Sequence, residues 1–286
     1  VGEIRCRVNP QKIIIKKGKA EGVELDSGET LRADFVVSGL DPQQSFIELL
    51  ADAPLPDTWR KRTENFQYNL IAPLFALNLN LAEAPCYRAA ENLPELEHAL
   101  MVILGLEHYE QYPEIVACHE QGKIPATVMW GSCPTVFDPA QAPEGRHTAF
   151  MWEKLPYAVD GDPANWDRIK DGHGRHMLEL WGEYAPNLAG DAVLSWFTRS
   201  PLDVERQFPN MRRGDLLVGA FTNGQIGFDR PFPGAGNYRG YFEGYYLCGS
   251  CCHPGGNITG LPGYNCAQVL LADLGIKAPW TPEPLV

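Results

Sequence analysis

The sequence has no long apolar run and few basic residues. No stretch approaches the ~18 consecutive apolar residues that a membrane span requires. The 24 Lys and Arg residues are outnumbered by 36 Asp and Glu residues, which gives a formal net charge of −12. Nucleic-acid binding requires a basic face, so this charge argues against a nucleic-acid partner and weakens the case for docking on an anionic membrane. We therefore expect no transmembrane segment and no nucleic-acid function.

Several motifs of catalysis and nucleotide binding are also missing. The chain contains no GxGxxG, no Gly-Lys-Ser/Thr, no GxSxG and no HExxH. Sequence support is therefore lacking for a P-loop, a serine-hydrolase elbow and a zinc protease. We expect no metal site. No side chain stands out as an essential acid, base or nucleophile, so catalytic residues are left unassigned.

Cysteine is present, but in a pattern that does not predict disulfides. A chain of 286 residues can bury a core without such cross-links, and it opens without a secretory signal pattern. We therefore expect free thiols in a cytoplasmic protein. The eight cysteines are Cys6, Cys86, Cys118, Cys133, Cys248, Cys251, Cys252 and Cys266.

Strand-like and helix-like patterns alternate along the chain, which predicts a mixed α/β or α+β fold. Asp41 and Pro42 are suited to begin one of the helices. β-structure is expected over 11–37, 72–85, 126–132, 145–157, 192–200 and 243–250. Helices are expected over 41–52, 106–122, 164–187, 201–208 and 264–275.

The helix expected over 164–187 has an apolar stripe, although Gly172 and Gly174 weaken the expectation that it is unbroken. The stripe consists of Trp166, Ile169, Met177, Leu180 and Trp181. Five aromatic residues on or beside the expected strands favour a core position over a pocket, although an aromatic-lined cavity would suit an apolar substrate. They are Trp130, Phe150, Trp152, Tyr157 and Trp196.

A glycine-rich loop, HPGGNITGLPG, lies between the strand over 243–250 and the last helix. Glycine allows positive φ and lets the main chain approach a ligand closely, and N–H groups converge where a helix begins. The pattern favours a site for phosphate or for a flat, oxygen-bearing ring over a structural tight turn. The neighbouring Cys248-x-x-Cys251 could be a redox pair or half a zinc site, but small side chains beside a cofactor are the favoured interpretation.

From Tyr246 to Gly275 the sequence resembles the carboxy-terminal flavin-contacting segment of the phytoene-desaturase-like flavoproteins, a family that includes pyridine-nucleotide-disulfide-oxidoreductase-domain proteins. RADFVVSGLDPQQSFIELL resembles the strand that returns to the flavin domain of that family. GKIPATVMWGSCPTVFDPAQAPEGRHTAFMWEKLPY resembles its substrate-domain strands, and FPNMRRGDLLVGAFTNGQIGFDRPFPGAGNYR the segment before its last strand. These matches occur in family order and cover most of the chain.

The resemblance implies a glutathione-reductase-type FAD domain whose terminal strand, loop and helix lie in this chain. It assigns flavin contacts to Gly249, Ser250, His253, Pro254, Gly255, Gly256, Asn257, Ile258, Thr259 and Gly260. His253 could equally serve only to orient the loop. Near the substrate face of the flavin it places Gln225, Phe228, Asp229 and Arg230, for which a surface hairpin is the competing interpretation.

The resemblance also implies three regions: a β-segment returning to the FAD domain (1–40), a substrate-binding domain (41–240) and the FAD-contacting end (241–286). Because the GxGxxG unit is absent, we expect a second chain or a missing amino-terminal segment to supply it. A fragment, a nicked product, a subunit of a split enzyme and a relative that has lost the cofactor all stay open.

The expected function is that of the carboxy-terminal part of an FAD-dependent oxidoreductase. It would remove a hydride or two electrons from a C–H or C–N bond of a small organic substrate. The lack of an obvious amphipathic membrane helix leans away from carotenoids as substrates. The alternatives are a non-catalytic binding or scaffold subunit and a thiol-redox protein that uses Cys248, Cys251 and Cys252.

Overall fold

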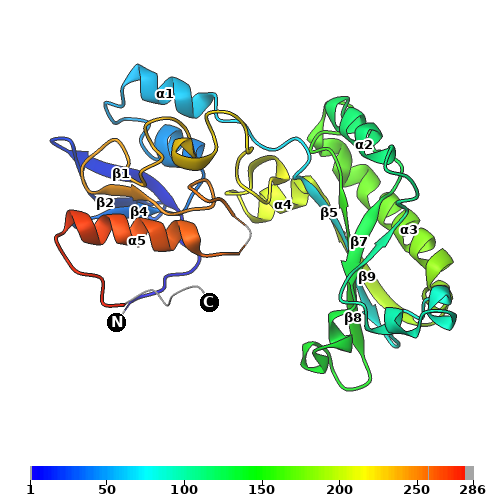
Figure 1. The fold of residues 1–286 in the computed structure, drawn as a ribbon. Helices are drawn as coiled ribbons and strands as arrows, with labels where there is room; N and C mark the ends of the chain where they lie inside the picture. Colours follow the sequence, from blue (N-terminus) through cyan, green and yellow to red (C-terminus); the bar gives the residue numbers. More distant parts are fainter. Residues whose placement is uncertain (1, 257, 281–286) are drawn as a thin grey trace. The chain divides into compact units, whose positions relative to one another are not determined.

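The computed structural model describes residues 2–256 and 258–280 and divides the chain into two compact units. Unit 1 combines Val1–Asn69 with Leu217–Val286, and unit 2 is the continuous segment Leu70–Leu216. Helices and sheets occur in both units, which confirms the predicted mixed α/β class (Figure 1).

Unit 2 is built on a five-stranded antiparallel sheet with strand order β6-β7-β8-β5-β9. Successive side chains along each strand point to opposite faces of the sheet, and Leu77, Met129 and Met151 lie together on the buried face. The strands are β5 (Leu74–Leu81), β6 (Val102–Leu104), β7 (Met129–Ser132), β8 (His147–Lys154) and β9 (Val193–Arg199). The helices are α2 (Gln111–Glu120), α3 (Trp166–Tyr184) and α4 (Pro201–Gln207).

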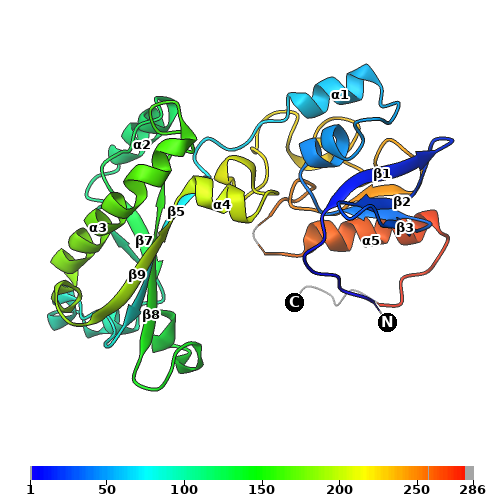
Figure 2. The same ribbon diagram turned by 180° about the vertical axis from the view of Figure 1, so that it is seen from behind.

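Helix α3 covers the buried face of this sheet and runs along it in both views (Figure 2). The predicted stripe is confirmed: Trp166, Met177 and Trp181 are fully buried in the core of unit 2. The two glycines do not interrupt the helix. A Cβ at Gly174 would lie 2.2 Å from the Thr198 Cγ2 atom of β9, so this glycine permits the close packing of helix and sheet.

A buried polar pair lies between α3 and the sheet. His173 Nε2 is 2.6 Å from Glu153 Oε2, and the two side chains are 8% and 1% exposed. The His173 ring also meets Phe75 edge-on, with centroids 5.0 Å apart. Local sequence patterns do not reveal this pairing, because His173 lies in α3 and Glu153 lies in β8, twenty residues earlier in the chain.

Unit 1 contains two small sheets. Strands β1, β2 and β3 form an antiparallel sheet, and β4 pairs in parallel with β10, which comes some 200 residues later in the chain. The strands are β1 (Pro10–Lys16), β2 (Lys19–Leu25), β3 (Thr30–Arg32), β4 (Val36–Ser38) and β10 (Tyr245–Leu247). The helices are α1 (Asp57–Glu64) and α5 (Leu261–Asp273), the latter packed on β10.

One predicted helix of unit 1 is much shorter than expected. Instead of a helix over 41–52, a five-residue π-helical turn spans Gln44–Glu48. The Asp41 carboxylate accepts hydrogen bonds from the N–H groups of Gln43 and Gln44, as its predicted capping role requires. The Leu49 carbonyl accepts an N–H from Ile13 of β1, a long-range contact that removes it from any continued helix.

The compact units do not coincide with the boundaries expected at residues 40 and 240. Residues 41–69 and 217–240 pack within unit 1, together with the segments expected to belong to the FAD domain. Side-chain contacts show why: Gln225 exchanges two hydrogen bonds with the Gln67 main chain, and Arg62 donates to the Pro233 carbonyl. None of the helices in the described residues combines the length and apolar character that a membrane crossing needs.

Candidate functional site

The candidate site begins where the two parallel strands of unit 1 end. Gly39 follows β4 and Gly249 follows β10, so both lie at the carboxyl ends of the strands, where open α/β sheets bind ligands. A Cβ at Gly249 would lie 2.3 Å from the Gly39 carbonyl oxygen. The two backbones can approach this closely only because residue 249 has no side chain.

The glycine loop then runs from this strand end to the start of α5. Gly255 adopts φ +112° and Gly260 φ +67°, conformations that residues with side chains rarely adopt. A Cβ at Gly260 would meet no atom within 4 Å, so the space beside it is open. Gly260 is the N-cap of the 13-residue helix α5, whose amino-terminal end carries positive potential.

Within the loop, the predicted flavin-contacting residues differ in exposure. Gly255 is buried, whereas His253, Thr259 and Ile258 are exposed, the last at φ +62°. The intermediate positions are Gly249, Ser250, Pro254 and Gly256. Asn257 lies outside the described residues. The loop thus presents its second half to solvent and buries part of its first half. Contact with a flavin stays a prediction for all of these residues.

Two side chains anchor the start of the loop by donating hydrogen bonds to main-chain carbonyls. The Arg230 guanidinium donates to the Ser250 carbonyl at 3.1 Å and also to carbonyls between Leu217 and Gln225. Tyr238 Oη donates to the His253 carbonyl at 2.8 Å. This contact anchors the main chain at residue 253 and does not involve the imidazole, so the orienting role of the His253 side chain stays a prediction.

The structure does not bring the four predicted substrate-contacting residues together on one surface. Gln225 and Arg230 are buried, 6% and 0% exposed, with their polar groups turned to main-chain atoms. Asp229 is partly exposed and Phe228 is 93% exposed. Sequence reasoning missed the anchoring geometry of Arg230, because the carbonyls that it contacts are spread over more than thirty residues.

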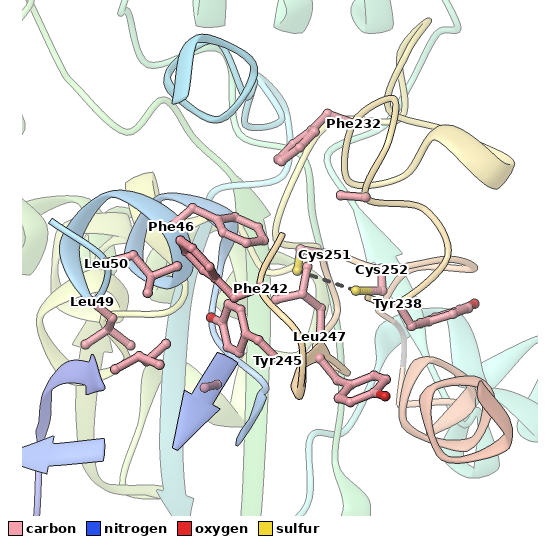
Figure 3. Packing of buried hydrophobic residues seen from close by; sticks show 14 of the residues in the cluster. Phe46, Leu49, Leu50, Phe232, Tyr238, Phe242, Tyr245, Leu247, Cys251 and Cys252 are labelled. Carbon is pink, nitrogen blue, oxygen red and sulfur yellow. Dashed lines mark hydrogen bonds between the residues drawn. The ribbon is translucent and has the colours of Figure 1, made fainter. Parts of the chain in front are cut away.

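The cysteines beside the loop are packed thiols (Figure 3). Cys251 Sγ and Cys252 Sγ are 3.9 Å apart, in a hydrogen-bonded contact rather than a disulfide. The hydrogen bond with Cys251 and burial raise the pKa of the Cys252 thiol well above its usual range, and burial raises the pKa of Cys266 to about 12. These shifts disfavour the reactive thiolate that a redox cysteine requires. No cluster of His, Cys, Asp and Glu suited to a metal ion occurs in residues 2–256 and 258–280.

Sequence comparison relates this chain to several known proteins. The chain is 31% identical over 264 residues to mouse pyridine nucleotide-disulfide oxidoreductase domain-containing protein 2, covering 90% of this chain and 45% of that protein. It is 26% identical to one of the subunits of limonene dehydrogenase from Castellaniella defragrans (96% and 52% covered) and 24% identical to a neurosporene-forming phytoene desaturase of Cereibacter sphaeroides (97% and 50%). The chain thus spans about half the length of the curated relatives it matches.

Among solved structures, an oxidoreductase from Methanosarcina mazei is similar with a TM-score of 0.48 and 16% identity, covering 93% of this chain and 49% of that one. No family model matches the chain. The relatives define a class of oxidoreductases and desaturases. Over at least 90% of its length this chain is similar to these proteins, which supports the phytoene-desaturase-like oxidoreductase family that its sequence resemblance implied.

Proposed function

We propose that this chain is the carboxy-terminal part of an FAD-dependent oxidoreductase, in which unit 1 contributes the terminal flavin-binding segment and unit 2 the substrate-binding domain. The observation that carries the proposal is the glycine loop, which joins the carboxyl end of a parallel strand to the amino-terminal end of α5. Such a junction presents backbone N–H groups and positive potential to an anionic or oxygen-bearing ligand.

The residues present fit a flavin at this place. Gly39 and Gly249 place no side chain at the strand ends, and the space beside Gly260 is open. The loop would hold the cofactor mainly through its backbone, and the end of α5 would stabilise negative charge on a ring placed against it. When bound, FAD supplies a two-electron acceptor for a C–H or C–N bond of an organic substrate. Unit 2 would position that substrate and exclude water.

Strand β4 supports the proposal that another polypeptide segment completes the flavin domain. Val36 donates its N–H to the Gly244 carbonyl, and the Ser38 carbonyl accepts from Cys248, so both residues face the β10 side. Val37, between them, faces the opposite edge and is 45% exposed. Within the described part of the chain no strand pairs with that edge. A segment carrying GxGxxG, in the same or a second chain, would add a strand there.

The second candidate is a non-catalytic scaffold subunit that never holds a flavin. The two functions differ in one observable, because only the first gives a bound chromophore once the missing segment is present. The protein purified from its natural source should absorb between roughly 350 and 500 nm, the range implied by a flavin. A colourless preparation that contains the partner would favour the scaffold.

A matched pair of glycine variants tests the loop itself. Gly260 and Gly275 lie at opposite ends of α5, with φ +67° and +66°, and a Cβ at either position meets no atom within 4 Å. Valine should therefore strain the backbone similarly at both positions. In the assembled protein we expect Gly260→Val to lose flavin and Gly275→Val to retain it, measured as the ratio of flavin to protein absorbance. Full retention by Gly260→Val would overturn the proposed site.

A further inference from the structure

Unit 2 contains an apolar cavity that the flavin-binding role of unit 1 does not require. It has a volume of about 450 Å³, within the range of small-molecule pockets. Helix α2 contributes Ile115 and Val116 to its wall, and the sheet contributes Ile103 of β6 and Trp130 of β7. Ile103 is 60% exposed and Val116 38%, so these apolar side chains are not covered by the protein itself.

Lys154, at the end of β8, is the cationic residue among those that line the cavity. Its Nζ atom lies 5.5 Å from the centroid of the Trp130 ring, which also lines the cavity. An ammonium group has three N–H donors, and among the described residues Lys154 Nζ donates one hydrogen bond, to the Ala72 carbonyl at 3.2 Å. In the described part of the chain no ion pair involves Lys154. Burial lowers the pKa of Lys154, and the nearby Asp215 partly offsets this effect.

The wall that faces Lys154 is fixed in place. His119 of α2 is buried, and its two ring nitrogens lie 3.0 Å from the Leu70 carbonyl and 3.1 Å from the Lys154 carbonyl. These contacts hold α2 to the end of the strand that carries Lys154. The cavity is therefore a preformed site: a largely apolar chamber whose lining includes one half-buried cation, Lys154, and one acid, Glu153, whose carboxylate is already paired with His173.

We propose that this cavity binds an apolar molecule bearing a carboxylate, with Lys154 as the counter-ion and the α2–β7 walls around the hydrocarbon part. A carboxylate supplies the acceptors that the ammonium lacks and the negative charge that its half-buried position favours. The apolar part of the ligand would cover Ile103, Val116 and Trp130. Because the cavity lies wholly in unit 2, the proposal does not depend on the flavin assignment.

Calorimetric titration of the chain with decanoate and with decan-1-ol, which share one hydrocarbon chain, tests the proposal. Decanoate should bind about ten-fold or more tightly than the alcohol, as expected for a charge-assisted hydrogen bond. Lys154→Met removes the cation and keeps a side chain of similar length, so it should reduce decanoate affinity about ten-fold or more, to the level of the alcohol. Lys123→Met, at an exposed lysine outside the cavity, is the matched control and should bind both ligands like the unmodified chain.

A second variant locates the binding site without altering charge. Val116→Trp places a larger side chain in the chamber from a helix position that is 38% exposed, and it should abolish binding of both ligands. Thermal unfolding of each variant confirms that it is folded. The proposal is overturned if the unmodified chain binds decanoate no better than decan-1-ol, if Lys154→Met binds decanoate normally, or if folded Val116→Trp still binds it.

Discussion

The two units differ in how they complete their sheets. Unit 2 pairs five antiparallel strands and covers one face with α3, so its core is closed by its own residues. In unit 1, the parallel pair β4–β10 is only two strands wide, and no strand of the described residues pairs with the second edge of β4. Parallel sheets are normally extended and covered on both faces, whereas small antiparallel sheets stand alone more readily.

This difference determines what each unit can bind by itself. A self-contained unit can hold a ligand by itself, as we propose for the Lys154 cavity. A unit with an open parallel edge presents half of a site, as we propose for the flavin loop.

The buried pair in unit 2 should be the most sensitive point of the fold. His173→Ala leaves the Glu153 carboxylate buried without its partner, and its other oxygen, Oε1, already has no hydrogen-bond partner among the described residues. We expect a loss of about 3–5 kcal/mol in the free energy of unfolding, measured by urea denaturation. A loss below about 1 kcal/mol, the range of exposed ion pairs, would show that the pair does not support the closed core.

The two glycines of α3 should respond in opposite directions. Gly174→Val would force carbon atoms against Thr198 of β9, so we expect a loss of about 1–3 kcal/mol. Gly172 has no atom within 4 Å of an added Cβ, so Gly172→Ala should stabilise the helix by about 0.5–1 kcal/mol. Thermal unfolding measures both. Equal effects at the two positions would mean that α3 does not pack on the sheet as described.

The open edge of unit 1 should be visible in amide hydrogen exchange. The Val36 N–H is bonded to the Gly244 carbonyl at 2.9 Å and should be protected, whereas the Val37 N–H should exchange within about ten-fold of the unfolded rate. In the assembled protein the Val37 amide should become protected as well. Strong protection of Val37 in the chain alone would show that its edge is already paired.

The smallest effect should come from a surface ion pair of unit 1. Arg239 Nη2 lies 2.6 Å from Asp273 Oδ1, but the two side chains are 42% and 31% exposed, so solvent screens the interaction. Arg239→Ala should therefore lower the free energy of unfolding by less than about 1 kcal/mol, and added salt should reduce even that difference. A larger, salt-insensitive loss in denaturant unfolding would show that this pair holds α5 in place.

Local patterns in the sequence predicted much of the fold. Strands β5, β7, β8 and β9 of unit 2 and the stripe of α3 are confirmed, because their periodicity depends on near neighbours, whereas the short strand β6 was not predicted. The buried roles of Arg230 and Gln225 and the short turn at Gln44–Glu48 depend on partners far along the chain, which periodicity does not report. Helix α3 is unbroken despite Gly172 and Gly174, and the packing of Gly174 against Thr198 of β9 is another contact that local patterns do not report.

The two candidate sites also differ in whether their residues are close together or far apart in the sequence. The glycine loop was found because its residues are consecutive between a strand and a helix. The Lys154 cavity was missed because its walls come from four separate segments, and Trp130 was assigned to the core rather than to a pocket. All three residues of Val102–Leu104 are apolar, so no alternation in the sequence marks Ile103 as the side chain that is turned outward.

Native mass spectrometry of the protein from its natural source tests the central claim most directly. We expect an assembly larger than 31.8 kDa that carries FAD. It should include a GxGxxG segment, either in a companion chain or in a longer form of this one. A 31.8 kDa chain that holds no flavin and is found with no such segment would contradict it, because the loop would then have no cofactor to bind.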